Sequence, residues 1–187
     1  MNIIVRSARN AYFVRPDTTW ERDAEDFYPP EDISSISFTP TLFAHICKPG
    51  RSILEKFAPR YFDGIGFGLL LYPQDMLDGR DDSIARASCL DHTSFLTLPV
   101  DMPANESRFA ATKNGILVCE GLCKVPDTAA SIASAISEAS EYIYLRHGDL
   151  LAIELAAPSP LVSRAEREAE IGLIFEGRTN YGFKIIF

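Results

Sequence analysis

Residues 62–76 read FDGIGFGLLLYPQDM, an apolar run that closes on Tyr72, Pro73 and Asp75. A short run of large apolar side chains bounded by glycine and proline is typical of a buried β-strand. Leucine fills residues 69–71, at the centre of this run, where an active site would need a charged or polar group. The stretch therefore predicts a strand that builds the core and offers no catalytic side chain at its middle.

Short segments of the same kind recur along most of the chain, rich in Ile, Val, Phe and Leu and bounded by turn-forming residues. Runs of this length and composition indicate strands. Asn114-Gly115 predicts a tight hairpin turn, because both residues accept positive φ. Besides GIGFGLLLY (64–72), the predicted strands are NIIV (2–5), AYFVR (11–15), SISFTPTLFAHIC (35–47), GILVCEGLC (115–123), DLLAIEL (149–155), AEIGLIFEG (169–177) and YGFKIIF (181–187).

The clearest helical pattern is PDTAASIASAISEASEYI, residues 126–143. Its isoleucines fall on one face, while serine and glutamate fill the other, as in a helix packed on a sheet. Asp127 or Thr128 can cap the start. The pattern predicts a helix of about four turns or fewer.

Two other helical patterns are weaker. Pro59 limits residues 52–62 to a short or bent element, and Gly79 splits residues 74–87 into two pieces. Many strands with few helices between them predict an α+β fold with a mixed, curled sheet. Because the chain shows no repeat or linker, we expect residues 1–187 to form a single domain.

Composition narrows the classes of partner. Hydrophobic residues make up 47% of the chain and charged residues 24%, as in an ordinary globular protein. The net charge of −8 and the absence of a basic cluster argue against nucleic acid. No run approaches the roughly 20 apolar residues that span a bilayer, and the first residues do not resemble a secretory signal. We therefore expect a cytoplasmic protein that binds neither nucleic acid nor membrane, with mostly buried free thiols at Cys47, Cys89, Cys119 and Cys123.

Residues that could carry chemistry are scattered. No two histidines have metal-ligand spacing, so His45 is interpreted as a strand residue and His92 as a loop residue. Ser88, Asp91 and His92 have the residue types of a hydrolytic triad, but they are neighbours in sequence and lack a nucleophile elbow. Taken by themselves, the residues predict a soluble α+β domain without a recognisable active site.

The stretch LEKFAPRYFDGIGFGLLLYPQDM resembles the central part of the fumarylacetoacetate hydrolase family, in which a helix leads into a strand with the pattern G-x-D-x-T-A-R-D. Other segments resemble the family in the same order along the chain: AYFVRPDTTW resembles F-x-K-P-D/S-T, ISFTPTLFAHI the strand with paired glutamates, ARASCLDHTSFL the A-K-x-F-D segment, ESRFAATKNGILVCEG the N-G hairpin, and SIASAISEASEYIYLRHGDLLAIEL the long helix and G-D-L strand. The resemblance implies a mixed β-roll or sandwich of the family's C-terminal-domain type, with a few flanking helices.

The resemblance also implies a metal site that this chain has lost. Family enzymes bind Mg²⁺ or a similar ion through two glutamates in E-x-E and one aspartate, and the ion stabilises an enolate. Gly68 and Asp75 match the glycine and the final aspartate of the strand motif. The ligand positions then fall on Thr39, Thr41 and Leu70, so we expect no bound metal and no other cofactor.

Further departures lie around this site. Ser88 replaces the family's lysine in A-K-x-F-D, while Asp91 keeps the aspartate. Arg9 and Asn10 match G-R-N-Y, but the lid segment that should follow them is missing, and LAAPSPL replaces T-G-T-P-x-G. By family match, the pocket is lined by Arg9, Asn10, Arg15, Thr39, Thr41, Leu70 and Asp75.

The sequence therefore predicts a catalytically inactive relative, a pseudoenzyme that serves as a binding or interaction module and forms a homodimer. The alternative is a divergent hydrolase, isomerase or decarboxylase acting on acylpyruvates or 2-oxo acids. Its catalytic groups would come from Ser88, Asp91, His92 or His45. We expect Mg²⁺ or Mn²⁺ to bind only if this alternative holds. A third possibility is a cavity for an uncharged small ligand. A shifted alignment would match Glu31 and Asp32 to the paired glutamates of E-x-E. These two residues are adjacent, so on a strand they would face opposite sides of the sheet and could not share a metal ion.

Overall fold

The computed structural model describes residues 1–102, 106–175 and 178–187. Its strands are β1 (Ile3–Arg6), β2 (Tyr12–Arg15), β3 (Trp20–Glu21), β4 (Ser35–Ile46), β5 (Phe62–Pro73), β6 (Ser94–Leu96), β7 (Ser107–Lys113), β8 (Ile116–Cys123), β9 (Leu150–Glu154), β10 (Ser159–Ser163), β11 (Glu168–Phe175) and β12 (Arg178–Ile186). Its α-helices are α1 (Asp81–Ala87) and α2 (Val125–Tyr142). Short 3-10 segments span Asp17–Thr19, Glu55–Arg60, Gln74–Met76 and Arg164–Glu166.

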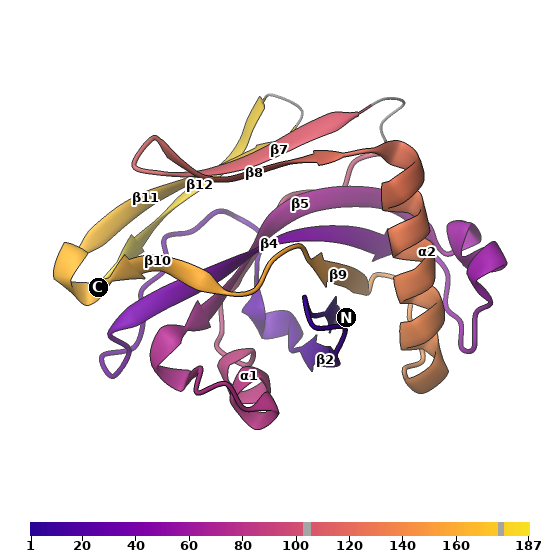
Figure 1. The fold of residues 1–187 in the computed structure, drawn as a ribbon, viewed down its shortest axis with the longest axis horizontal. Coiled ribbons are helices and arrows are strands. Elements are labelled where there is room, and N and C mark those ends of the chain that lie inside the picture. Colours follow the sequence, from indigo (N-terminus) through magenta and orange to yellow (C-terminus); the bar gives the residue numbers. More distant parts are fainter. Residues whose placement is uncertain (103–105, 176–177) are drawn as a thin grey trace.

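The strands form two sheets. The eight-stranded sheet has the order β2-β1-β9-β4-β5-β6-β3, with β10 paired to β4, and it mixes parallel and antiparallel pairs. The four-stranded sheet has the order β12-β11-β7-β8. The smaller sheet covers one face of the larger one, α1 lies on the opposite side, and α2 packs at one end (Figure 1). This is the mixed α+β architecture with a curled sheet that the sequence predicts.

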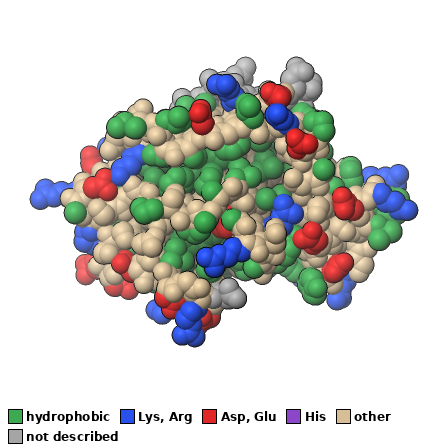
Figure 2. Space-filling model, viewed as in Figure 1, with side chains coloured by type: hydrophobic (Ala, Val, Ile, Leu, Met, Phe, Trp, Pro, Cys, Tyr) green, Lys and Arg blue, Asp and Glu red, His purple; other side chains and the backbone are tan. Residues whose placement is uncertain are grey.

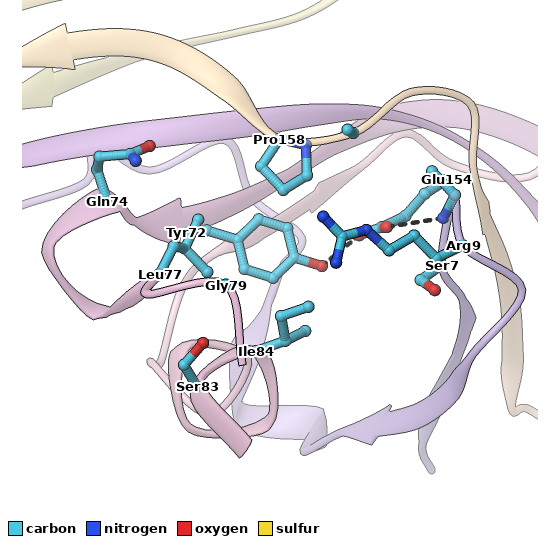
Figure 3. A pocket seen from close by; sticks show the side chains of 12 residues that line it. Ser7, Arg9, Tyr72, Gln74, Leu77, Gly79, Ser83, Ile84, Glu154 and Pro158 are labelled. Atoms are coloured by element: carbon cyan, nitrogen blue, oxygen red, sulfur yellow. Dashed lines mark hydrogen bonds between the residues drawn. The ribbon is translucent and has the colours of Figure 1, made fainter. Parts of the chain in front are cut away.

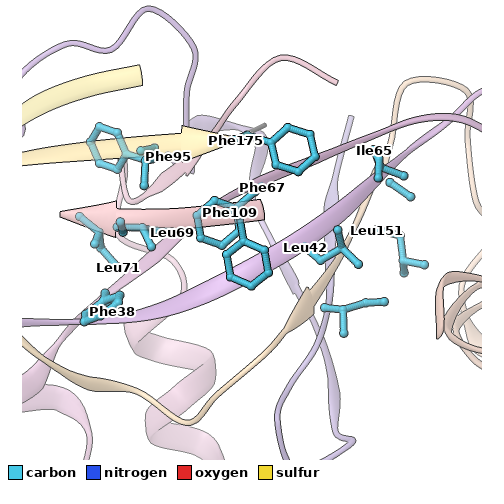
Figure 4. Packing of buried hydrophobic residues seen from close by; sticks show 14 of the residues in the cluster. Phe38, Leu42, Ile65, Phe67, Leu69, Leu71, Phe95, Phe109, Leu151 and Phe175 are labelled. Carbon is cyan, nitrogen blue, oxygen red and sulfur yellow. The ribbon is translucent and has the colours of Figure 1, made fainter. Parts of the chain in front are cut away.

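Strands β4 and β5 form the centre of the larger sheet, and FDGIGFGLLLYPQDM supplies β5. Their residues are almost all buried, because both faces of the pair are covered. Successive side chains of a strand point to opposite faces. Phe67, Leu69 and Leu71 accordingly join the core between the two sheets (Figure 4). Leu70 and Tyr72 join a smaller cluster on the other face.

Two glycines of β5 allow close packing. A Cβ on Gly66 would lie 2.3 Å from the ring of Phe43, and a Cβ on Gly68 would lie 2.2 Å from the carbonyl oxygen of Phe95. Real Cβ atoms do not approach other atoms so closely, so the Phe43 ring can pack over β5 at Gly66, and β6 can approach β5 at Gly68, only because glycine stands at each position. The spacing of the glycines is therefore part of what builds this sheet.

The predicted turns and helices are confirmed with differences. Asn114 and Gly115 have φ values of 51° and 76° and connect β7 to β8, as predicted. The long helix is longer than expected, with 18 residues, and it begins at Val125 after Lys124. Asp127 and Thr128 therefore lie inside the helix, and the prediction that one of them caps it is wrong. Pro126 explains the early start, because proline favours the first helical positions.

Other expectations are met in part. Residues 55–60 form a short 3-10 segment containing Pro59, as the proline suggests. The last two residues of the strand predicted at 169–177 lie outside the described residues. Cys123 is buried, Cys47 and Cys119 are partly exposed, and Cys89 is exposed, so the prediction of mostly buried thiols is wrong. Cys89 follows α1 and donates from its thiol to the carbonyl of Ala85, 3.3 Å away, at the surface. Within the parts that the structure describes, no helix has both the length and the apolarity needed to cross a bilayer.

Candidate functional site

The three positions matched to metal ligands lie together on one face of the larger sheet. Thr39 in β4 stands directly opposite Leu70 in β5, and Thr41 stands opposite Glu154 in β9. Residues directly opposite each other on neighbouring strands place their side chains on the same face. All three matched side chains are fully buried. The strand pairing therefore groups these positions as a shared ligand site would require, and it adds Glu154 to them.

Glu154 is the carboxylate of this face, and it is 8% exposed. Tyr72 donates from its hydroxyl to Oε1 at 2.5 Å, and Thr39 donates to the same oxygen at 3.3 Å. The backbone N–H of Ala8 donates to Oε2 at 3.2 Å. Burial raises the pKa of Glu154 because it penalises the charged form, although these hydrogen bonds and Arg15 act in the opposite direction. The group is thus held in place by three strands and the loop after β1.

Arg15 lies beneath Tyr72 and Glu154 and is fully buried. Its guanidinium donates to the carbonyl oxygens of Ser88 at 3.1 Å, Thr93 at 3.3 Å and Leu71 at 2.8 Å, and to the Thr93 hydroxyl at 3.0 Å. Its central carbon lies 4.9 Å from the centre of the Tyr72 ring. Burial lowers the pKa of Arg15, and the charges of Tyr72 and Glu154 oppose that shift. A guanidinium nevertheless keeps its proton in proteins, so this is a permanent buried positive charge.

A cleft of about 220 Å³ opens above Tyr72 and Glu154. Its walls come from the loop after β1, the end of β5, the start of α1 and the segment after β9. Arg9 is exposed at its rim, and Figure 3 shows its guanidinium beside the Tyr72 hydroxyl and Glu154. The lining combines these polar groups with apolar side chains, including Leu77, Ile84 and Pro158. Such a mixture is typical of small-molecule sites.

A larger hollow of about 650 Å³ lies between β8, the start of α2 and β9. Its lining includes Leu42, Phe109, Leu122 and Ile153, and Figure 2 shows hydrophobic side chains gathered in the middle of this side of the molecule. Its polar lining residues include Arg6, Lys124 and Asp127, and Glu154 borders this hollow as well as the smaller cleft. The smaller cleft is the better candidate for chemistry, because it alone of the two is lined by both Tyr72 and Arg9 beside Glu154.

The predicted site residues are distributed unevenly around this cleft. Arg9 lines it, while Thr39 contacts it through Glu154 and Arg15 through Tyr72. Asn10 lies in the turn between β1 and β2 with φ of 59° and does not line the cleft. Asp75 accepts from the amide and hydroxyl of Ser34, both at 2.7 Å, so it ties two loops together.

The hydrogen bonds of Ser88, Asp91 and His92 do not build a triad. The Ser88 hydroxyl donates to the carbonyl of Ile84 in α1 at 2.6 Å, and its own carbonyl accepts from Arg15. Asp91 accepts from Thr18, and His92 pairs with Glu21 at 2.8 Å.

His45 pairs with Asp63 at 2.6 Å, six residues along β4 from Thr39. Neither residue lines the cleft.

Sequence reasoning missed Glu154 and Tyr72. Both residues sit at the end of an apolar strand, in DLLAIEL and GLLLY. A lone polar residue in such a place is the sequence feature that could have marked them as candidate site residues. Their contact joins residues 82 positions apart in the chain. It became visible only once β4 was known to lie between β5 and β9.

The fold is shared with proteins of known structure. A protein from Yersinia pestis assigned to the fumarylacetoacetate hydrolase family has a TM-score of 0.82 at 19% identity, covering 99% of this chain and 92% of that chain. Fumarylpyruvate hydrolase from Pseudomonas aeruginosa, in complex with Mn²⁺ and pyruvate, has a TM-score of 0.80 at 16% identity, covering 100% and 90%. 2-Hydroxyhepta-2,4-diene-1,7-dioate isomerase from Mycobacterium marinum has a TM-score of 0.80 at 16% identity, covering 99% and 74%.

The sequence itself matches no protein-family model and no curated protein. The relationship therefore rests on three-dimensional structure. The chain is a small protein with the fumarylacetoacetate hydrolase fold, and hydrolases and isomerases are among the proteins that share it.

The residues at the matched positions do not fit a hard divalent cation. Such ions bind oxygen ligands, above all carboxylates. Leu70 offers no donor atom, and the hydroxyls of Thr39 and Thr41 donate to Glu154 and to the Thr39 carbonyl. Among the described residues, no three His, Cys, Asp or Glu side chains converge as a metal-binding group. Glu154 alone could not hold the ion in a fixed geometry.

Proposed function

We propose that this protein is a divergent hydrolase or isomerase that binds small oxo acids of the acylpyruvate type in the cleft above Glu154, without a divalent cation. The observation that carries the proposal is the buried Glu154 carboxylate, fixed by Tyr72 and Thr39 at the floor of the cleft. A general base needs such a position, within reach of a bound ligand and with a pKa raised by burial. Arg9 at the rim suits the carboxylate of the ligand.

The substrate class comes from proteins that share the fold. Fumarylpyruvate hydrolase and maleylpyruvate hydrolase act on acylpyruvates, and a 5-carboxymethyl-2-hydroxymuconate isomerase belongs to the same group of structures. The cleft here has one cation, Arg9, among its lining residues together with apolar walls. A small oxo acid matches that lining in size, and its carboxylate can pair with Arg9 while Glu154 faces the rest of the ligand.

A second candidate is a binding or interaction module without catalytic activity, which would act as a homodimer. The observation that favours it is the replacement of three ligand positions by Thr39, Thr41 and Leu70, all buried. Enolate stabilisation is worth several kcal/mol, and the loss of a cation removes a large part of it. In this case the cleft would retain a ligand and leave it unchanged.

Turnover of acetylpyruvate, fumarylpyruvate and oxaloacetate in excess EDTA tests the proposal. We expect a rate above buffer that falls about a hundredfold or more in Glu154→Gln, as for loss of a general base. Glu138→Gln is the matched control, because Glu138 is an exposed acid on α2 that bonds Tyr12. Binding without turnover would favour the second candidate. Activity that requires added Mn²⁺ would contradict the proposed cation-free site.

A further inference from the structure

Arg15 is a buried cation to which no carboxylate is hydrogen-bonded among the described residues. Its partners are three backbone carbonyls and one hydroxyl. Burying an unpaired charge is costly, and proteins tolerate it where other groups compensate. Carbonyl dipoles compensate part of this cost. Arg15 thus keeps its charge directly under the site while remaining out of contact with the cleft.

The positive charge reaches the cleft through one side chain. The Arg15 guanidinium lies 4.9 Å from the centre of the Tyr72 ring, and the Tyr72 hydroxyl donates to Glu154 at 2.5 Å. A cation against the face of an aromatic ring is attracted by the ring's quadrupole, more strongly when desolvated. It also makes the phenol a stronger hydrogen-bond donor, because it stabilises negative charge on the oxygen. Arg15, Tyr72 and Glu154 therefore form a continuous chain of polar contacts from core to cleft.

The charges around the cleft favour an anionic ligand. Arg15 below and Arg9 at the rim are both positive, while Glu154 is the acid among the residues that line the cleft. With Glu154 ionised, the three groups sum to one positive charge. Charges buried in a medium of low dielectric constant act over longer distances than charges in water. An oxo acid anion entering the cleft would therefore meet a positive potential supplied by side chains alone.

We propose that Arg15, acting through Tyr72, supplies the fixed positive charge for an oxo acid anion in the cleft without a divalent cation, whereas the Pseudomonas aeruginosa hydrolase was obtained in complex with Mn²⁺ and pyruvate. The proposal rests on the proposed function, because it requires that the cleft bind oxo acids. Arg15 is a positioning residue in this scheme, since it touches Tyr72 and not the ligand. Ser88 stands at the position matched to the lysine of A-K-x-F-D, and its carbonyl accepts from Arg15. The Arg15 charge therefore lies next to the place where the resemblance would put a cation.

A purely structural role is the competing explanation. Arg15 ties β5, the end of α1 and the loop before β6 together through Leu71, Ser88 and Thr93. Loss of these bonds would destabilise the protein, but the affinity for an anionic ligand would not depend on the charge at position 15. The two roles differ in what a charged replacement restores. Lysine returns the charge but cannot make the same set of planar bonds.

Calorimetric titration of the full chain with oxalate and with pyruvate provides the test. Each titration is made in excess EDTA and again with Mn²⁺. We expect wild-type affinities in the two conditions to agree within about twofold. Binding that needs Mn²⁺ would overturn the role of Arg15 while keeping the oxo acid ligand. Absence of binding in both conditions would overturn the proposed function as well.

Variants test the role of the charge. We expect Arg15→Met to weaken oxalate binding about tenfold or more, the scale of one charge-assisted contact, and Arg15→Lys to recover most of that loss. Thermal unfolding identifies variants that remain folded. Arg22→Met is the matched control, because Arg22 lies 4.2 Å over the Trp20 ring, away from the cleft lining. Equal affinities in folded Arg15→Met and wild type would overturn the proposal.

Tyr72→Phe keeps the test decisive if Arg15→Met does not fold. It leaves the carbonyl bonds of Arg15 intact and removes the hydroxyl that connects the guanidinium to the cleft. We expect a loss of oxalate affinity of about tenfold. Unchanged affinity in folded Tyr72→Phe would overturn the proposal by itself.

Discussion

Tyr72 in β5 donates its hydroxyl proton to Glu154 in β9 across the intervening strand β4. This contact places the carboxylate of the site on β9, whereas the family motif would place acids on β4 and β5. A carboxylate with three hydrogen-bond donors behaves differently from a carboxylate waiting for a cation. Its negative charge is already stabilised by hydrogen bonds within the protein, so the chemistry of the cleft depends on the contact between Tyr72 and Glu154.

Tyr72→Phe is expected to destabilise the fold. The change leaves Glu154 buried with one donor fewer, and loss of a partner to a buried charged group costs about 1–3 kcal/mol. Urea unfolding followed by circular dichroism measures the difference. Tyr12→Phe is the control, because the Tyr12 hydroxyl bonds the exposed Glu138 and its loss is expected to cost less than about 1 kcal/mol. Equal losses in both variants would show that the buried pair is not special.

Glu154 is expected to make stability fall as pH rises. Its pKa in the folded protein lies above the ordinary 4.5, mainly through burial, so the folded state binds more protons than the unfolded state in this range. The contribution is complete below pH 4.5 and is lost as pH rises through the folded pKa. Glu154→Gln does not titrate, so the unfolding free energy of wild type relative to this variant should decrease from pH 4.5 to 8. A constant difference over that range would contradict the prediction.

Glu21 is expected to act in the opposite direction. Burial disfavours its charge, but hydrogen bonds from His92 and from the amides of Asp23 and Glu25 outweigh that effect and lower its pKa. Its stabilisation is therefore present above the ordinary 4.5 and is lost as pH falls through the folded pKa. The stability of Glu21→Gln relative to wild type should improve on acidification between pH 5 and 3. Unfolding titrations at several pH values measure this, and parallel curves would reject it.

The strands were predictable because their signals are local. FDGIGFGLLLYPQDM shows the apolar run and the glycines that β5 needs, and Asn114-Gly115 specifies its turn through positive φ. The start of α2 was misjudged because proline is accepted at the first helical positions, which moved the boundary ahead of Asp127. Local errors of this kind shift an element without changing the fold.

The site was less predictable because it depends on pairing between distant strands. Thr39 and Leu70 could be selected from the resemblance, and their ladder pairing places them together. Glu154 entered through the pairing of β9 with β4, which no local pattern specifies. The burial of Arg15 was equally hidden, since an arginine after an apolar run is usually exposed.

Gly68→Ala is expected to disrupt the pairing of β5 with β6. The new Cβ would lie 2.2 Å from the Phe95 carbonyl oxygen and 2.8 Å from the Leu96 Cα, both backbone atoms that cannot rotate away. We expect a loss of about 3 kcal/mol or more in unfolding free energy. Gly182→Ala in β12 is the control, with its nearest contact at 3.7 Å, and should change stability by less than about 0.5 kcal/mol. Similar stabilities of the two variants would contradict the packing argument.

Leu70→Asp tests whether the matched position tolerates the acid of the family motif. Leu70 is fully buried beside Phe43 and Tyr72, so a carboxylate there would lose its hydration without gaining a cation. We expect a loss of about 4 kcal/mol or more at pH 7. Leu70→Asn has nearly the same shape without the charge, so its stability should exceed that of Leu70→Asp above pH 6 and approach it at pH 4. If the two variants stayed equally stable at every pH, a charge at this position would be accepted, and the site would have to be open to a counter-ion after all.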